Sequence, residues 1–336
     1  MYNSLSRLVS AFGVAGHEED VRKVILDEGS FSDYRVDKIG NLICRNTYDD
    51  SAPSVLLDAH MDEVGFIVRY IDDAGMIYVN AVGGIDSRAL IGKELLIRGE
   101  EDLVGIVANI PPHMSKDNKV PGVSELQVDT GLTKEELQDI VRIGTPIGYV
   151  PHMERLGGTA VSGKAFDNRV GCLALCELSK RLGDKRNVTY LFSTQEEVGT
   201  RGATVALKDI SPDIAICVDA TQGDMHFIDS PITRSLGSGA IIGTGPNIDP
   251  GVFRWLVNSA RSSGVPYTTK AYPAPTPTNL RSMQLLAGGV VSGLVAIPCR
   301  YMHSPSEVVD VNDIISVISL LERFIDDVDD VIRGDF

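Results

Sequence analysis

Apolar positions along the chain change their spacing twice, and the changes divide the sequence into three stretches. In residues 5–28 they recur at mixed helical spacing, which favours a helix after Gly16. Between residues 54 and 150 they form short strand-like runs separated by glycine and aspartate turns. After residue 158, strand-like runs alternate with helical stripes. The pattern therefore predicts an all-β stretch set between two parts that contain helices.

The middle stretch predicts a β-rich unit with a single helix. Its strand-like runs are residues 66–68, 76–79, 95–97, 104–107 and 147–150. Thr133 and Glu136 form the pattern of a capping box ahead of Leu137 and Ile140, so a helix is expected to begin there.

The flanking stretches predict a sheet with helices on both faces. Strand-like runs lie at 55–57, 188–192, 214–218, 266–271 and 290–297, and helical stripes at 167–182, 203–207, 251–263 and 311–325. Alternating strands and helices are typical of α/β folds. Because an all-β segment interrupts this alternation, we expect two domains: residues 1–63 together with 158–336, and an insert of residues 64–157.

Composition and charge narrow the classes of function. The chain has 336 residues, of which 43% are hydrophobic, and 31 Lys+Arg against 46 Asp+Glu give a net charge of −15. This length accommodates one large domain or two. With a pI near 4.8, the chain lacks the excess of lysine and arginine that nucleic acids and anionic lipid surfaces attract. We therefore expect neither a nucleic-acid partner nor a membrane partner.

The five cysteines indicate the compartment. They are odd in number, scattered and set in apolar context, at Cys44, Cys172, Cys176, Cys217 and Cys299. Such cysteines are typical of reduced core thiols in a cytoplasmic protein. Only Cys172 and Cys176 have the i,i+4 spacing of a helix, so a metal site there is the weaker alternative. No apolar run approaches the roughly 20 residues that span a bilayer, and no signal peptide is predicted.

Candidate chemistry gathers just after the predicted strands, where ligands bind in open α/β sheets. These residues are His60, Asp62, Glu196, Glu197, Asp219 and His303, together with Asp167 at the start of a predicted helix. Taken alone, each is more often a helix cap or a solvated turn. Two histidines and several carboxylates that converge without cysteine favour zinc, cobalt or manganese.

The segments that carry these residues resemble the glutamyl aminopeptidase and tetrahedral aminopeptidase family of co-catalytic metallopeptidases. The five segments are residues 58–65 (DAHMDEVG), 163–171 (GKAFDNRVG), 195–203 (QEEVGTRGA), 218–221 (VDAT) and 298–305 (PCRYMHSP). They follow the family's order with suitable gaps, and the similarity covers nearly the whole chain. Some members of the family carry the older label endoglucanase M.

The resemblance implies a zinc-exopeptidase-like fold and a dinuclear site. The expected fold is a mixed central sheet flanked by helices, with a small β-barrel-like insert that mediates dimerisation or oligomerisation. Two divalent metal ions, zinc or cobalt, are expected in each subunit. Asp167 would bridge both ions, His60 and Asp219 would complete one site, and Glu197 and His303 would complete the other. Asp62 would be the carboxylate that fixes the tautomer of His60.

The activity implied is the metal-dependent removal of N-terminal residues from short peptides. Two metal ions would activate a bridging water molecule, and Glu196 would act as the general base. The family forms dimers and tetrahedral twelve-subunit shells, so a homo-oligomer is expected.

Two alternative functions stay open. A glycoside hydrolase uses two carboxylates roughly 5–10 Å apart without metal, which makes no use of converging histidines. A scaffold or binding protein could keep the fold without catalysis, but Glu196, the expected general base, is present.

Substrate preference is the least determined property. Where the family often shows Thr-Asp-Ala, this chain has Thr278, Asn279 and Leu280, which removes a charge near the expected substrate pocket. His113, in the insert, is interpreted either as a surface residue or as a contact between subunits or a pocket wall. Candidate contacts for an acidic substrate side chain are Lys164, Arg169, Arg201, Arg234, Arg254 and Arg281.

Overall fold

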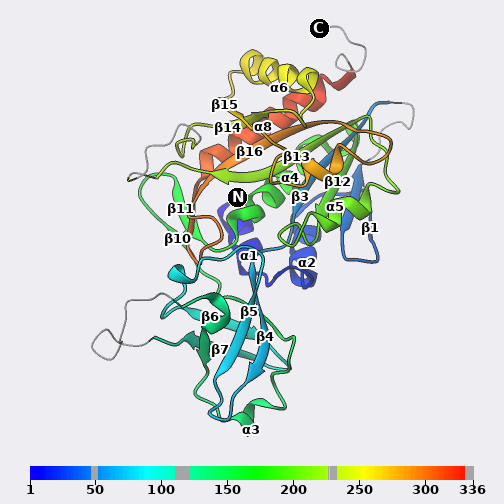
Figure 1. Ribbon diagram of the computed structural model, residues 1–336. Coiled ribbons are helices and arrows are strands. Elements are labelled where there is room, and N and C mark those ends of the chain that lie inside the picture. The colour runs from blue at the N-terminus through cyan, green and yellow to red at the C-terminus, as the bar shows by residue number, and fades with distance from the viewer. Residues whose placement is uncertain (47–51, 110–120, 226, 228–232, 330–336) are drawn as a thin grey trace.

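The computed structural model describes residues 1–46, 52–109, 121–225, 227 and 233–329. Figure 1 shows a large body of sheet and helices with a small barrel below it. His113 lies outside the described residues, so its expected role is not addressed.

The large body is built on a mixed sheet of eleven strands within the described residues. Their order is β1-β2-β12-β3-β13-β16-β17-β11-β10, and β14 pairs with β16 and with β15. The bounds are β1 Asp33–Val36, β2 Leu42–Asn46, β3 Ser54–His60, β10 Met153–Arg155, β11 Ala160–Gly163, β12 Asn187–Ser193, β13 Ile214–Gln222, β14 Ala240–Thr244, β15 Tyr267–Ala271, β16 Val291–Arg300 and β17 Glu307–Asp310.

Four neighbouring strands in the centre of this sheet are parallel. β3 lies between β12 and β13, and β16 follows on the far side of β13, with parallel register throughout. These strands have almost continuous apolar runs because both of their faces are covered. Since their carboxyl ends meet at one edge, the side chains that follow each strand are brought together.

Helices cover both faces of the sheet, as the alternation predicted. They are α1 Tyr2–Ser10, α2 Glu19–Glu28, α4 Phe166–Leu182, α5 Arg201–Ala206, α6 Pro250–Ser263, α7 Leu280–Met283 and α8 Val311–Asp326, with a short 3-10 helix η3 at Gly183–Lys185. One apolar cluster packs α1, α2, α4, α6 and α8 against the sheet. A second apolar cluster packs α5 and α7 against it. Leu57 belongs to the first cluster and its neighbour Leu56 to the second, as expected for side chains that alternate along a strand.

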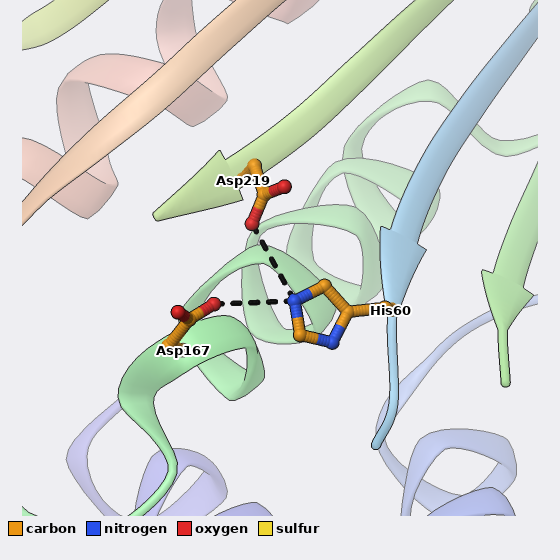
Figure 2. A group of neighbouring side chains, drawn as sticks. All are labelled: His60, Asp167 and Asp219. Atoms are coloured by element: carbon orange, nitrogen blue, oxygen red, sulfur yellow. Dashed lines mark hydrogen bonds and ion pairs between the residues drawn. The ribbon is translucent and has the colours of Figure 1, made fainter. Parts of the chain in front are cut away.

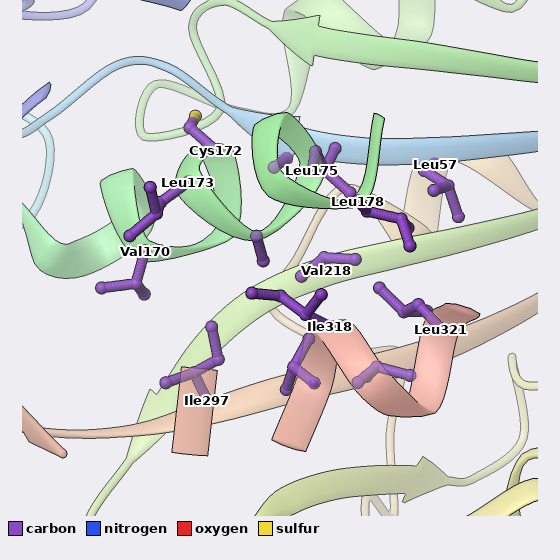
Figure 3. Close-up of a cluster of buried hydrophobic side chains, with 14 of the residues drawn as sticks. Leu57, Val170, Cys172, Leu173, Leu175, Leu178, Val218, Ile297, Ile318 and Leu321 are labelled. Atoms are coloured by element: carbon purple, nitrogen blue, oxygen red, sulfur yellow. The ribbon is translucent and has the colours of Figure 1, made fainter. Parts of the chain in front are cut away.

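The first of these clusters holds α4 and α8 against the strands. Figure 3 shows Leu178 of α4 and Ile318 of α8 on either side of Val218 of β13, and all three belong to this cluster. Each fully buried side chain of this size stabilises the fold by about 2 kcal/mol. The cluster therefore gives the parallel strands, and the residues at their ends, a rigid support.

The small body is a closed barrel of six strands with a core of its own. The strand order is β4-β5-β8-β7-β6-β9, and β9 pairs back to β4. Its elements are β4 Gly65–Ile71, β5 Ile77–Val82, β6 Glu94–Arg98, β7 Asp102–Val107, β8 Gln127–Asp129, β9 Pro146–Tyr149, α3 Lys134–Leu137 and the 3-10 helices η1 Ser87–Ala89 and η2 Val123–Glu125. The expected capping box of Thr133 and Glu136 is present at α3. The fold class, a mixed α/β sheet with a β-barrel insert, is therefore confirmed.

The exact domain boundaries stay a prediction. The barrel ends at Tyr149, and β10, which lies inside the expected insert of 64–157, pairs with β11 of the large sheet.

All five cysteines are free and buried. Among the described residues, no helix is long and apolar enough to cross a membrane.

Candidate metal centre

His60, Asp167 and Asp219 converge at the carboxyl edge of the central strands. His60 is the last residue of β3, Asp219 lies within β13, and Asp167 is in the first turn of α4. Figure 2 shows both carboxylates directed at one ring nitrogen of His60. The His60 Nε2 atom lies 3.1 Å from Asp167 Oδ1 and 3.5 Å from Asp219 Oδ1.

A second group shares the carboxylate of Asp167. The His303 Nε2 atom lies 3.3 Å from Asp167 Oδ2 and 3.2 Å from Glu197 Oε1. Asp167 thus presents one oxygen to each histidine and is only 6% exposed. This is the arrangement of a carboxylate between two adjacent sites.

Backbone carbonyls orient both imidazoles. The His60 Nδ1 atom lies 3.0 Å from the carbonyl oxygen of Asp62, and the His303 Nδ1 atom lies 2.8 Å from that of Gly84. Because a carbonyl only accepts hydrogen bonds, each Nδ1 donates and each Nε2 is left to face the carboxylates. The carboxylate of Asp62, expected to orient His60, is farther from Nδ1 at 3.5 Å.

The carboxylate of Asp62 holds the loop that carries the two glutamates. It accepts hydrogen bonds from the backbone N–H groups of Glu196 at 2.9 Å and Glu197 at 3.0 Å. In the first turn of α5, which follows this loop, a Cβ atom at Gly202 would lie 2.2 Å from the carbonyl oxygen of Thr194, so this close approach requires glycine. Asp62 is therefore a positioning residue for Glu196 and Glu197.

Glu307 positions the backbone of Asp167 and of His303, as Asp62 positions that of the two glutamates. The sequence analysis missed Glu307. Its carboxylate accepts hydrogen bonds from the backbone N–H groups of Asp167 at 3.0 Å and His303 at 2.7 Å. Glu307 lies only four residues after His303, at the start of β17. A search for buried carboxylates just beyond the last histidine would have found it.

Charge and burial shift the pKa values throughout the cluster. Burial alone would lower the pKa of His60, but Asp167, Asp219 and Asp62 outweigh it and raise the pKa well above its ordinary value. Burial also opposes ionisation of Asp167, yet His303 and His60 hold the pKa of this carboxyl well below its usual range. The cluster therefore attracts positive charge strongly at each imidazole Nε2 position.

The two groups open into a cavity of about 240 Å³. Glu196 lines this cavity, and burial, followed by the negative charges of Asp219, Glu197 and Asp62, raises its pKa to about 9 against the attraction of His60. The other lining residues include Thr221, Lys270, Tyr272, Pro277, Thr278 and Met302. None of the six basic residues proposed from the sequence lines the cavity; Lys270 does.

The donor atoms suit divalent transition metals. Three groups have ligand atoms within 4.8 Å of one another: His60 with Asp167 and Asp219; Asp167 with Glu197 and His303; and His60 with Glu196 and Glu197. Imidazole nitrogens mixed with carboxylate oxygens favour zinc, cobalt or manganese over calcium or magnesium. None of these candidate groups, within the described residues, contains Cys172 or Cys176.

Comparison with known proteins decides the family. The family model described as M42 glutamyl aminopeptidase matches residues 40–320. The chain belongs to this family. The M42 assignment makes it a peptide hydrolase, as the five sequence segments predicted.

Relatives match over nearly their whole length. A lysyl aminopeptidase from Pyrococcus furiosus is 30% identical, and the alignment covers 96% of each chain. The structure of a tetrahedral (TET) aminopeptidase from a marine sediment Thaumarchaeota archaeon is 27% identical, with a TM-score of 0.92 over 100% of this chain and 98% of that one. The TET1 peptidase of Pyrococcus horikoshii, which assembles into a tetrahedron or a large octahedral shell, is 29% identical, with a TM-score of 0.87 over 96% and 98%.

One structural neighbour of this M42 peptidase carries the older label. An endoglucanase from Thermotoga maritima is 28% identical, with a TM-score of 0.81 over 98% of both chains. The label thus occurs among close structural neighbours, as the sequence resemblance implied.

Asn279 is buried in this M42 peptidase and is not among the residues that line the cavity. It is 1% exposed, and its side-chain nitrogen donates to Asp58 Oδ2 at 2.9 Å and to Ser193 Oγ at 2.8 Å. Its neighbours Pro277 and Thr278 do line the cavity, so Asn279 lies near it, and its effect on substrate preference stays a prediction. Burial raises the pKa of Asp58 to about 6, against the hydrogen bonds from Ser193 and Asn279.

Replacing Asn279 by aspartate should destabilise the protein by about 3 kcal/mol at pH 8. The change removes a donor to Asp58 and sets two buried carboxylates side by side, so one of them keeps its proton in the folded state. Because the folded-state pKa then lies above the unfolded value of about 4, stability falls as pH rises from about 4. Chemical denaturation at pH 5 and pH 8 measures this loss.

Asn258 provides the matched control, because it is exposed on α6. Asn258→Asp should leave the denaturation midpoint nearly unchanged at both pH values. If Asn279→Asp behaves like this control at pH 8, the buried pair with Asp58 does not stabilise the fold.

Proposed function

We propose that this M42 peptidase is a metal-dependent aminopeptidase that removes N-terminal residues from short peptides. The observation that carries the proposal is the Asp167 carboxylate, which presents one oxygen to the His60 group and the other to the His303 group at the floor of a cavity. Two adjacent sites that share a carboxylate are typical of hydrolases with two metal ions.

The residues that would hold the two ions follow from these contacts. His60, Asp167 and Asp219 would hold one, and Asp167, Glu197 and His303 the other. Zinc or cobalt suits this set of nitrogen and oxygen donors. When bound, such ions supply positive charge that acidifies water and polarises a peptide carbonyl.

Glu196 is the proton carrier in this proposal. Its carboxylate lines the cavity beside both groups, and its backbone is held by Asp62. It would take the proton from the attacking water and give it to the nitrogen of the leaving peptide. The excess of carboxylates around it also suits recognition of the free amino group that an exopeptidase requires.

Removal of metal should abolish peptide hydrolysis reversibly. After treatment with EDTA, cleavage of aminoacyl p-nitroanilides should be lost, and added zinc or cobalt should restore it. The same additions should raise the melting temperature, because ions that bind only the folded state stabilise it. Full activity after exhaustive chelation would contradict the proposal, and hydrolysis of a glycoside that survives chelation would favour the glycosidase alternative.

We further propose that the protein works as a cytoplasmic homo-oligomer. The related TET1 peptidase assembles into shells, and the barrel within residues 64–157 is the element expected to join subunits. Five free, buried cysteines support a reducing compartment. Light scattering should give a mass of several subunits, consistent with dimers that build a dodecamer, and the mass of one subunit would contradict association.

A further inference from the structure

Glu18 is a buried carboxylate beside the loop that follows β12 and carries Glu196. It stands at the N-cap position of α2 and is 1% exposed, yet its side chain makes no capping hydrogen bond to that helix. Its Oε1 atom instead accepts hydrogen bonds from the backbone N–H of Gln195 at 3.3 Å, from the hydroxyl of Thr194, and from the backbone N–H of Gly16 at 2.8 Å. The carboxylate therefore joins the segment before α2 to the loop.

Four successive backbone N–H groups of this loop donate to side-chain oxygens from distant segments. The acceptors are Asn41 for Thr194 at 3.0 Å, Glu18 for Gln195, and Asp62 for both Glu196 and Glu197. The loop lies between β12 and α5 and has no strand or helix of its own. Its conformation therefore depends on these three side chains.

Gln195 needs such support because its backbone is left-handed. Its φ is 55°, in a region that residues with a Cβ atom seldom occupy, since that atom crowds the following carbonyl oxygen. Residues stay in this region only where their surroundings hold them there. Glu196 follows directly, so the conformation of Gln195 sets the direction in which the Glu196 side chain leaves the backbone.

The segment that carries Glu18 is fixed to the strand end that carries Asp62. The backbone N–H of Glu63 donates to the carbonyl of Gly13 at 2.9 Å, and the N–H of Ala15 donates to the carbonyl of Glu63 at 3.2 Å. Glu63 follows Asp62 directly in the chain. The two carboxylates that hold the loop are therefore fixed relative to each other.

We propose that Glu18 is a positioning residue for peptide hydrolysis, which directs the Glu196 carboxylate into the cavity by holding Thr194 and Gln195. This inference rests on the proposed function, in which Glu196 carries the proton. Glu18 is not among the described residues that line the cavity, so its effect passes through the loop. Loss of this acceptor should slow turnover without weakening the binding of substrate.

The test compares the metal-loaded wild type with Glu18→Met and Glu18→Gln, using the aminoacyl p-nitroanilide that the wild type cleaves fastest. Methionine has a similar length but is a poor acceptor, so kcat should fall about 10- to 100-fold while KM changes less than about threefold. Glutamine keeps an acceptor oxygen, so Glu18→Gln should retain most of the wild-type kcat. Glu19, which is exposed, provides the control, and Glu19→Met should change neither constant.

A double-mutant cycle separates positioning from a general loss of structure. If Glu18 acts through Glu196, Glu18→Met should change kcat very little in the Glu196→Gln background, because the group that it misplaces is already absent. An equal fold-loss in both backgrounds would overturn the inference. Melting temperature and bound metal are measured for every variant.

Thr194→Val decides the question if Glu18→Met does not fold. This change keeps the shape of the side chain and removes the hydroxyl that donates to Glu18. The kcat should fall about fivefold, and the loss should disappear in the Glu196→Gln background. An unchanged kcat in Thr194→Val would then overturn the inference.

The outcomes also separate this inference from the proposed function. A wild-type kcat in Glu18→Met, or an equal loss in Glu18→Gln, would overturn the role of Glu18 and leave the aminopeptidase function standing. If the metal-loaded wild type cleaves no aminoacyl p-nitroanilide, or if Glu196→Gln turns over at the wild-type rate, the proposed function or its proton carrier fails, and the inference fails with it.

Discussion

Glu196→Gln should lower kcat about a thousandfold while the protein still binds its metal ions. Glutamine has nearly the same shape as glutamate and keeps the backbone N–H that Asp62 accepts, so the loop should not move. The amide cannot take a proton from water or deliver one to the leaving nitrogen. Steady-state hydrolysis of an aminoacyl p-nitroanilide measures the loss, and elemental analysis of the dialysed protein measures the bound metal.

The metal measurement distinguishes two roles for Glu196, because its carboxylate also falls within one candidate ligand group with His60 and Glu197. Loss of one ion from Glu196→Gln would make it a ligand. Near-normal turnover by the metal-loaded variant would contradict the assignment of Glu196 as the general base. Glu101, exposed at the edge of the barrel, provides the control, since Glu101→Gln should affect neither metal content nor rate.

Glu63→Gln should destabilise the fold by about 3–5 kcal/mol. Glu63 is buried with Lys164 and Arg169, and its carboxylate is the anion that both cations contact. An amide in its place leaves two uncompensated positive charges in the interior. Arg169 also donates to the backbone carbonyls of Met61 and Leu8, so the loss spreads to the segment after His60. The shift in the urea denaturation midpoint measures the effect.

An exposed ion pair gives the matched comparison. Glu100 lies 2.7 Å from Arg142, and both side chains are largely exposed, so Glu100→Gln should change stability only slightly. If Glu63→Gln costs no more than Glu100→Gln, the buried triad does not hold this part of the fold together.

The sequence predicted the central strands because parallel strands that are buried on both faces appear in the sequence as long apolar runs. Residues 188–192, 214–218 and 290–297 were all expected as strands, and they form β12, β13 and β16. The strands without an expected counterpart, none longer than five residues, are β1, β2, β8, β10, β11, β14 and β17. β1 is exposed along its length, and β8 and β10 have only three residues each. Such short strands owe their conformation to neighbouring strands more than to their own residues.

The site residues were predictable where strand ends and the family segments coincided. The contacts that support these residues could not be predicted, because such contacts join segments that lie far apart in the chain. Gly84 holds His303 through a backbone carbonyl, which leaves no trace in residue type. Glu307 and Lys270 became visible only when burial and the cavity were known.

The order of the central strands also has a consequence for how activity arises during synthesis. β3, which ends at His60, lies between β12 and β13, and His303 follows β16, the fourth of the central parallel strands and the last of them along the chain. A chain still on the ribosome and extended only to residue 290 has made His60, Asp167, Glu196 and Asp219 but neither β16 nor His303. Since synthesis runs from the N-terminus onward, the group of Asp167, Glu197 and His303 is the last of the candidate ligand groups to be complete. If the proposed function holds, a nascent chain should therefore show no peptidase activity until His303 has been translated.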